Sequence, residues 1–171
     1  GVFAPFDPEA LKLVLDLLCA EAGVEVHFGQ QVIAARREDD LLREVTVAGH
    51  GGQATHRASA FVDTTGDGDL AAFGGAATRY GNEDGVNLGT LGTRFSGLKP
   101  GTRVDAEAFG AAVREFGAYF LTKEKSVMIH LPLSGDLVAF VASAAYDPRD
   151  PVSTSAAEAN GRYQAWNYLS A

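Results

Sequence analysis

The sequence has a single cysteine, Cys19, among its 171 residues. One cysteine cannot form a disulfide within the chain, and no group of cysteines and histidines has the spacing of a metal site. Cys19 falls in an apolar helical pattern, so we expect it to be a packing residue and not a nucleophile. The sequence thus predicts neither a disulfide framework nor a metal site.

Basic residues and long apolar runs are also scarce. Lys and Arg number 14 against 22 Asp and Glu, which gives a formal net charge of −8. Nucleic acids and anionic membranes attract proteins through a basic face, so we expect binding to neither. No apolar run approaches the roughly 18 residues of a membrane span, and no signal-peptide pattern is present. These features favour a cytoplasmic protein.

What remains is the composition of an ordinary globular protein. Hydrophobic residues make up 46% of the chain and charged residues 21%, which suffices for one sizeable core, in one or two lobes. The order of helical and strand patterns predicts a mixed fold, α/β in the first part of the chain and α+β in the second.

The clearest signature of a site lies at residues 60–72. The run 60–62 is typical of a strand buried on both faces, and a loop with two glycines and an alanine-rich helical start follows. Ligands of open α/β sheets bind at such points, where glycine lets the backbone approach and helical N–H groups face the ligand. Asp67 and Asp69 disfavour bare phosphate but can accept hydrogen bonds from sugar hydroxyls. The loop therefore favours a nucleotide-like ligand.

Other interpretations of this loop stay open. It can be a plain surface turn in which Asp67 or Asp69 caps the following helix. It can also bind calcium, because Asp63, Asp67 and Asp69 occupy positions one, five and seven of an EF-hand loop. Against calcium, position twelve is Gly74 and a strand pattern precedes the loop. A phosphatase interpretation of Gly66 and Asp67 is weaker than the nucleotide-like one.

The residues before this loop predict a helix and then a β-meander. Asp7 can cap a helix that starts at Pro8, and apolar residues recur at helical spacing until Gly23. Alternating patterns predict strands at 24–28, 32–36, 42–47 and 53–58. The histidines of this region are expected at the surface: His27, His50 and His56.

The residues after the loop predict a second lobe, which begins near residue 78 at a polar, glycine-bearing stretch. Predicted elements are a strand at 88–95, a helix capped by Asp105, and hairpin strands at 127–133 and 137–141. We therefore divide the chain into residues 1–78, 79–146 and 147–171.

The last predicted helix starts near Ser155, which has the capping-box spacing to Glu158. Tyr163, Trp166 and Leu169 share one stripe of this helix. Such a stripe is usually core, but here it can also be exposed or pack between copies. A homo-oligomer is therefore one possible state of the protein.

Three stretches of the sequence resemble one family of proteins. Residues 62–71, Val-Asp-Thr-Thr-Gly-Asp-Gly-Asp-Leu-Ala, with Gly74-Gly75-Ala76 after them, resemble a signature of FAD-dependent oxidoreductases of the glutathione-reductase and fumarate-reductase type. Residues 7–36 are similar to the helix and strands before that signature, and residues 147–164 to a segment that leads into a long helix. The resemblance implies FAD as cofactor and hydride transfer between flavin and a small-molecule substrate.

The resemblance also implies roles for parts of the chain. Residues 1–78 would be an incomplete FAD-binding domain, 79–146 a substrate or cap lobe, and 147–171 a helix that returns toward the FAD-binding domain. The loop backbone would lie along FAD, and Val32 would border the adenine through main-chain groups, or else be an ordinary core valine. The implied cofactor-binding residues are Val32, Thr65, Gly66, Asp67, Gly68 and Asp69.

Catalytic residues are not identified by the resemblance. Arg94 and His130 are the candidates in the second lobe, because either can hold a substrate carboxylate or take part in proton transfer. The alternatives are an ion pair for Arg94 and a hydrogen-bonded strand histidine for His130.

One part of the family's pattern is missing. Such flavoproteins begin with a Gly-x-Gly-x-x-Gly turn that binds the pyrophosphate, and this sequence contains none. We therefore expect the chain to be the middle of a longer flavoprotein, and by itself to fold, to bind FAD weakly or not at all, and to be inactive. The alternative is a folding or assembly module with no ligand of its own.

Overall fold

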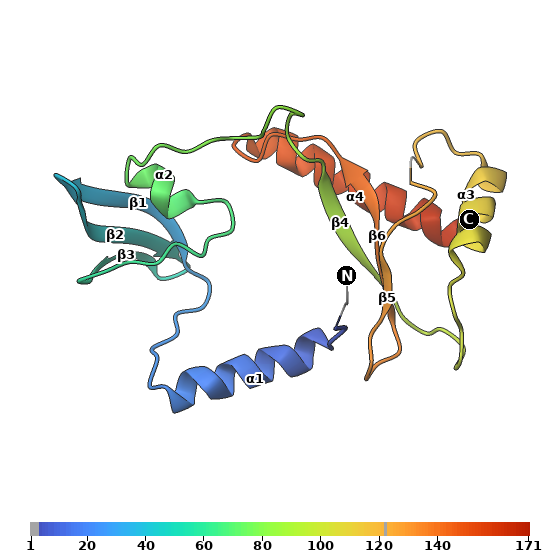
Figure 1. Cartoon of the computed structure of the whole chain (residues 1–171), viewed down its shortest axis with the longest axis horizontal. Coiled ribbons are helices and arrows are strands. Elements are labelled where there is room, and N and C mark those ends of the chain that lie inside the picture. Colours follow the sequence, from blue (N-terminus) through green and yellow to red (C-terminus); the bar gives the residue numbers. More distant parts are fainter. Residues whose placement is uncertain (1–3, 122) are drawn as a thin grey trace. The chain divides into compact units, whose positions relative to one another are not determined.

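The computed structural model describes residues 4–121 and 123–171 (Figure 1). Contacts divide the chain into two compact units. Unit 1 contains the chain up to Leu17 together with Asn87–Ala171, and unit 2 is Leu18–Val86. The sequence had suggested a division near residue 78. Helices and antiparallel sheets occur in both units, so the predicted mixed α/β fold class is confirmed.

Unit 2 is built on a three-stranded antiparallel sheet in the order β1-β2-β3 (Figure 1). Its strands are β1 (Gln31–Glu38), β2 (Leu41–Gly49) and β3 (Gly52–Arg57), and a short helix, α2 (Asp69–Phe73), follows. The predicted meander is thereby confirmed. The sheet is antiparallel throughout, so the loop before α2 does not follow a strand of a parallel sheet.

The core of unit 2 joins α2 to the sheet. Val45 and Val47 of β2 and Leu70 of α2 are buried together, and four partly buried side chains pack around them: Val32, Ala35, Leu42 and Phe61. A helix of five residues has little stability of its own in water. The burial of Leu70 is therefore what holds α2, and the loop before it, on the sheet.

Two strands that the sequence predicts in unit 2 are absent. Residues 24–28 and 60–62 have no strand structure, and the Val62 side chain is 83% exposed instead of buried on both faces. An alternating or apolar pattern indicates a surface suited to a sheet, but a strand forms only when a neighbour supplies hydrogen bonds and a face to pack on. Neither segment has such a neighbour among the described residues.

A row of ion pairs crosses the three strands of unit 2. Arg36, Glu44 and Arg57 lie directly opposite one another on β1, β2 and β3. Arg36 Nε donates to Glu44 Oε2 at 2.9 Å, and Arg57 Nε donates to Glu44 Oε1 at 2.6 Å. These bonds, that of Arg36 first, lower the pKa of Glu44 from 4.5 to about 2. Glu44 thus stabilises the pairing on both sides of the central strand.

Unit 1 is built on a second three-stranded antiparallel sheet, with β6 in its centre (Figure 1). Its strands are β4 (Gly89–Phe95), β5 (Met128–His130) and β6 (Leu137–Ala144), and its helices are α3 (Ala106–Phe116) and α4 (Pro151–Ser170). These elements confirm the predicted strand at 88–95, the helix after Asp105 and the hairpin. The Asp105 carboxylate accepts hydrogen bonds from the N–H groups of Glu107 and Ala108, as a helix cap does.

The core of unit 1 lies between its sheet and its helices. Five residues are buried together there: Val113, Leu121, Ala139, Val141 and Tyr168. The helix α4 packs on β6 and β4, and it approaches β4 closely at Gly161, where an added Cβ would lie 3.2 Å from the Leu91 Cβ. The Tyr168 hydroxyl accepts a hydrogen bond from Lys123 N and donates one to Lys123 O. It thereby fixes the segment after α3 to α4.

The start of α4 corrects the prediction. The helix begins at Pro151, where Asp150 caps it by accepting from Val152 N at 2.9 Å. Ser155 lies inside the helix and donates to Pro151 O, so the predicted capping box is wrong. Asp followed by Pro is the better start, because proline at the first helical position has no N–H to satisfy.

The stripe of Tyr163, Trp166 and Leu169 on α4 is exposed. The opposite face of the helix, with Gly161, Gln164 and Tyr168, is the buried one. Of the two readings of the stripe, core or exposed surface, the structure has the exposed surface.

The helix α1 spans Pro8–Glu21, as its first residue and its end before Gly23 predict. Its residues are not buried, although leucines and valines recur along it. The Asp7 carboxylate accepts a hydrogen bond from Ser134 N at 3.3 Å and is itself buried. Among the described residues, no helix has the length and apolar content to cross a bilayer.

The Glu44 ion pairs predict a pH-dependent contribution to stability. The folded pKa of Glu44 is lower than the unfolded one, so its contribution is complete above pH 4.5 and is lost as the pH falls toward about 2. We expect Glu44→Gln to lower the urea midpoint at neutral pH, with a difference from the unchanged protein that shrinks over this range. Glu9→Gln, in an exposed pair with Lys12, is the control. A difference that does not change with pH would contradict the prediction.

The Tyr168 hydroxyl predicts a stability loss in unit 1. Tyr168→Phe leaves the N–H and C=O of Lys123 without their partner, so we expect the free energy of unfolding to fall by about 1–3 kcal/mol in urea titrations. Tyr163→Phe is the matched control, because that side chain lies on the exposed stripe. Equal effects of the two substitutions would show that the Lys123 bonds contribute nothing.

Candidate functional site

The loop between Phe61 and α2 is held by one carboxylate, that of Asp63. Its Oδ1 accepts hydrogen bonds from Thr65 N at 3.0 Å and Thr65 Oγ1 at 2.7 Å, and its Oδ2 accepts from Ala71 N at 2.9 Å. Thr65 Oγ1 in turn accepts from Asp69 N at 2.9 Å. These bonds, the one from Thr65 N first, lower the pKa of Asp63. The ionised carboxylate thus ties the start of the loop to the first turn of α2.

Two glycines give the loop its shape. Gly66 and Gly68 have φ values of 88° and 74°, in the left-handed region that favours glycine. An added Cβ would meet no atom within 4 Å at either position. The loop therefore needs glycine for its conformation and leaves open space beside its backbone.

The tip of the loop leaves main-chain donors free. Hydrogen bonds between described residues use the N–H groups of Thr65, Asp69 and Ala71, but none uses those of Gly66, Asp67 or Gly68. Backbone N–H groups are strong donors that need a partner, whether water or a ligand. The loop thus presents three donors in a row to whatever binds there.

Neither of the two alternatives for this loop is supported by the structure. The N-cap of α2 is Gly68, without a side-chain hydrogen bond, so neither Asp67 nor Asp69 caps the helix as the plain-turn interpretation requires. Among the described residues no three of His, Cys, Asp and Glu are placed to hold a metal ion. The calcium interpretation therefore finds no ligand group here.

Val32 and the loop are connected through the small core of unit 2. The Val32 side chain packs against the cluster that contains Leu70, the residue after Asp69. Its strand, β1, is at the edge of the sheet, so one side of the strand carries unpaired N–H and C=O groups. The core role and a main-chain contact with a ligand are therefore compatible at this residue.

Arg94 and His130, the catalytic candidates, lie at the same end of the unit 1 sheet but on opposite faces. Arg94 is paired with Val138 and His130 with Leu137, and successive residues of a strand point to opposite faces. Arg94 also forms an ion pair with Asp136, with Nη2 2.6 Å from Oδ2. The structure thus does not bring the two candidates together.

His130 has one partnered ring nitrogen. Its Nδ1 lies 3.4 Å from Gly135 O, whereas Nε2 is buried and has no hydrogen-bond partner among the described residues. The other three histidines are exposed, and the rings of His27 and His56 lie edge to face with centroids 5.6 Å apart.

Asp63 is the residue of the loop that the sequence prediction did not single out. The prediction weighed it only as a calcium ligand, whereas its role is to hold the loop. The signal was present, because an Asp or Asn often bonds to the backbone two residues ahead, and Thr65 stands at that position. The bond to Ala71 joins residues eight positions apart and needed the structure.

Comparison with known proteins identifies a family. The family described as FAD dependent oxidoreductase matches residues 1–170, which includes both units, the loop at 63–69 and helix α4. Searches of curated proteins and of solved structures give no match.

The hydrogen bonds of Asp63 predict that the loop becomes less ordered when this carboxylate is replaced. Asp63→Asn keeps the shape of the side chain but removes its charge, and hydrogen bonds to charged groups are about twice as strong as neutral ones. We expect the amide hydrogens of Thr65 and Ala71 to exchange faster in this variant. Asp67→Asn is the control, since no hydrogen bond from a described residue reaches that carboxylate. Unchanged exchange in Asp63→Asn would show that the loop is held by other contacts.

Proposed function

The chain belongs to the family of FAD-dependent oxidoreductases, and from this premise we propose that its loop Thr65–Asp69 and its strand β1 form part of the FAD site. FAD is the cofactor of this family, and when bound it supplies hydride transfer to or from a substrate carbon. The observation that supports the placement is the row of free N–H groups at Gly66, Asp67 and Gly68.

The chemistry of the loop suits the sugar and phosphate portion of the cofactor. The backbone at Gly66 and Gly68 has no side chain to keep a ligand away, and free N–H groups donate well to anionic oxygens. The carboxylates of Asp67 and Asp69 would repel a phosphate at contact but accept hydrogen bonds from ribityl or ribose hydroxyls. We therefore place hydroxyls beside these carboxylates and the phosphate end over the glycines.

The role proposed for Val32 follows from its strand. The side chain packs in the core of unit 2, so only main-chain groups at the free edge of β1 remain for a ligand. An adenine edge carries both hydrogen-bond donors and acceptors, which such main-chain groups can match.

Residues 79–146 are proposed as the substrate or cap lobe, with no catalytic residue assigned. The charge of Arg94 is balanced by Asp136, and His130 lies on the other face of the sheet. The two residues therefore do not form one site in which Arg94 holds a substrate carboxylate and His130 transfers a proton. The alternative function, an assembly module with no ligand of its own, is favoured by the exposed apolar residues of α1.

The affinity of this chain for FAD is expected to be low. Each net hydrogen bond contributes on the order of 1 kcal/mol, so three N–H groups and a contact at β1 fall short of the roughly 8 kcal/mol that micromolar binding requires. The Gly-x-Gly-x-x-Gly turn that would add further donors does not occur in the sequence. We therefore expect a dissociation constant weaker than micromolar.

The test is a titration of the isotopically labelled chain with FAD, followed by NMR. We expect the amide signals of Gly66, Asp67 and Gly68 to shift with FAD, and Gly68→Ala to weaken the binding several-fold because alanine strains a φ of 74°. Gly51→Ala is the matched control, since Gly51 has no positive φ and no neighbour within 4 Å of an added Cβ.

Two results would contradict the proposal. The first is the absence of loop shifts at millimolar FAD, which would favour the assembly module. The second is micromolar binding with shifts outside the loop and β1, which would mean that the cofactor site lies elsewhere in the chain.

A further inference from the structure

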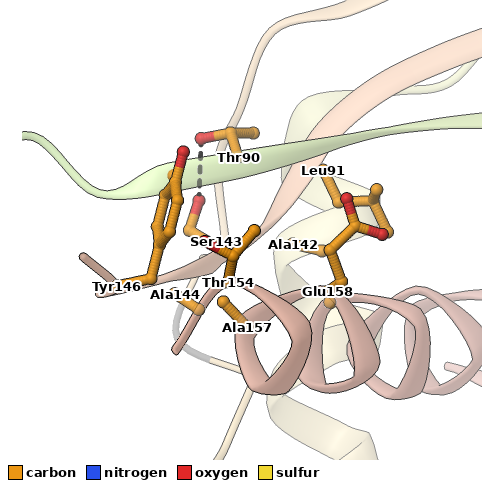
Figure 2. A pocket seen from close by; sticks show the side chains of 11 residues that line it. Thr90, Leu91, Ala142, Ser143, Ala144, Tyr146, Thr154, Ala157 and Glu158 are labelled. Atoms are coloured by element: carbon orange, nitrogen blue, oxygen red, sulfur yellow. Dashed lines mark hydrogen bonds between the residues drawn. The ribbon is translucent and has the colours of Figure 1, made fainter. Parts of the chain in front are cut away.

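A hollow of about 110 Å³ lies in unit 1 where the first half of α4 meets the ends of β4 and β6 (Figure 2). Its lining residues are Gly89, Thr90, Leu91, Ala142, Ser143, Ala144, Tyr146, Thr154, Ala157, Glu158 and Gly161. An apolar cavity of about 150 Å³ can hold benzene. This hollow therefore has room for a molecule, or the end of a molecule, somewhat smaller than that.

Two glycines keep the hollow in its present form. An added Cβ at Gly89 would lie 2.3 Å from the Tyr146 ring, and one at Gly161 would lie 3.2 Å from the Leu91 Cβ. The first contact is impossible without movement of the ring, and the second is tighter than ordinary packing. Tyr146 can lie against β4 only because Gly89 has no side chain. Likewise, α4 can approach β4 closely only because Gly161 has none.

The lining has an uneven chemistry. Of the eleven lining residues one is charged, Glu158, and none is a cation. The hydroxyls of Thr90 and Ser143 lie 3.0 Å apart and bond to each other, and since a hydroxyl has two lone pairs, this pair can still accept a hydrogen bond from a ligand. Leu91 and alanines form the remaining wall. The lining itself therefore offers acceptors and an apolar wall, while the cation Arg162 lies outside the lining and is paired with Glu158.

The arrangement of these groups has a direction. In Figure 2 the Tyr146 ring stands at one side of the hollow and the Glu158 carboxylate at the other, beside Leu91, with the Thr90 and Ser143 hydroxyls between the ring and Leu91. A ligand with one polar end and a short apolar chain matches this order of groups.

We propose that this hollow binds the ammonium end of a small aliphatic amine, with Glu158 as its counter-ion. An ammonium group donates three hydrogen bonds, to the Glu158 carboxylate and to hydroxyl or water oxygens, while the carbon chain lies against Leu91 and the alanines. The net charge of −8 attracts cations to the chain as a whole.

Glu158 already has one partner, Arg162. An ammonium ligand must either displace this partner or bind the carboxylate together with it. Arg162 Nη1 donates to Glu158 Oε2 at 2.8 Å, four residues apart on α4, with side chains that are 64% and 58% exposed. Such exposed pairs on a helix surface contribute little to stability. Glu158 Oε1 accepts no hydrogen bond from the described residues, so an ammonium group can bind it while Arg162 stays in place.

The inference goes beyond the FAD proposal and does not depend on it. The lining residues all belong to unit 1, whereas the proposed FAD loop belongs to unit 2, and the test uses no FAD. A failure of the amine test thus leaves the flavin proposal untouched, and the reverse also holds.

The experiment titrates the isotopically labelled chain with butylamine at neutral pH and follows the amide signals by NMR. Two compounds of similar size serve as controls, 1-butanol without a charge and propionate with the opposite charge. We expect butylamine to shift the amides of Leu91, Ser143 and Ala157 with millimolar affinity, and to bind more weakly as salt rises because the carboxylate is half exposed. The alcohol should bind at least about tenfold more weakly, and propionate not at all.

Two substitutions on α4 are expected to change the butylamine affinity in opposite directions. Glu158→Gln keeps the shape of the side chain and should weaken butylamine binding at least about tenfold, because the charged hydrogen bond is lost. Arg162→Gln removes the competing cation and should strengthen binding about twofold. Both residues are on the surface, so both variants are expected to fold, and helicity in circular dichroism verifies this.

Several outcomes would overturn the inference. These are equal binding of butylamine and 1-butanol, unchanged affinity in Glu158→Gln, amide shifts confined to residues away from the hollow, or no binding at millimolar amine. Weaker binding in Arg162→Gln would overturn the assignment of Glu158 as the counter-ion, since Arg162 would then be helping the ligand.

Discussion

The carboxylate of Asp63 is the contact on which the proposed cofactor loop depends. It accepts hydrogen bonds from both ends of the loop, at Thr65 and at Ala71, and so closes a turn that would otherwise have only the short α2 to define it. Loop closure costs chain entropy, and a charged acceptor with several donors offsets that cost better than a neutral one. Leu70 then fastens the closed loop to the sheet through the core of unit 2.

This arrangement separates the groups that build the loop from the groups that face a ligand. The side chains of Asp63 and Thr65 form hydrogen bonds within the loop. The N–H groups of Gly66, Asp67 and Gly68, in contrast, have no partner among the described residues. If the N–H groups that face a ligand also formed the internal hydrogen bonds of the loop, the loop would have to open before it could bind that ligand. The binding that we propose would leave the internal hydrogen bonds of the loop intact, which is the condition for a preorganised site.

Unit 1 shows the same division on a larger scale. Its core side of α4 carries Gly161, Gln164 and Tyr168, which set the approach to β4 and the contact with Lys123. The outer side carries the exposed aromatic stripe. Between them, the first turns of α4 present Glu158 to the hollow beside β4. One helix thus provides packing on one side and a charged group for a ligand on another.

The sequence by itself determined the class of the fold, most elements and the position of the candidate loop. Local signals suffice for these: Pro8 and Asp105 mark helix starts, alternation marks β1 to β3, and the run of glycines and aspartates at 66–69 marks a candidate ligand-binding loop. Such features depend on residues near one another in the chain, where dihedral preferences and capping act directly.

The tertiary structure decided what depends on a distant partner. Residues 24–28 and 60–62 have strand-like patterns but form no strand. A strand needs a neighbouring strand to pair with, and the local pattern does not show whether the fold provides one. The bond from Ala71 to Asp63, the opposite faces of Arg94 and His130, and the hollow at Glu158 likewise arise from residues brought together by folding. Burial and pairing are properties of the whole chain, so the sequence indicates which groups are available and the fold decides which of them meet.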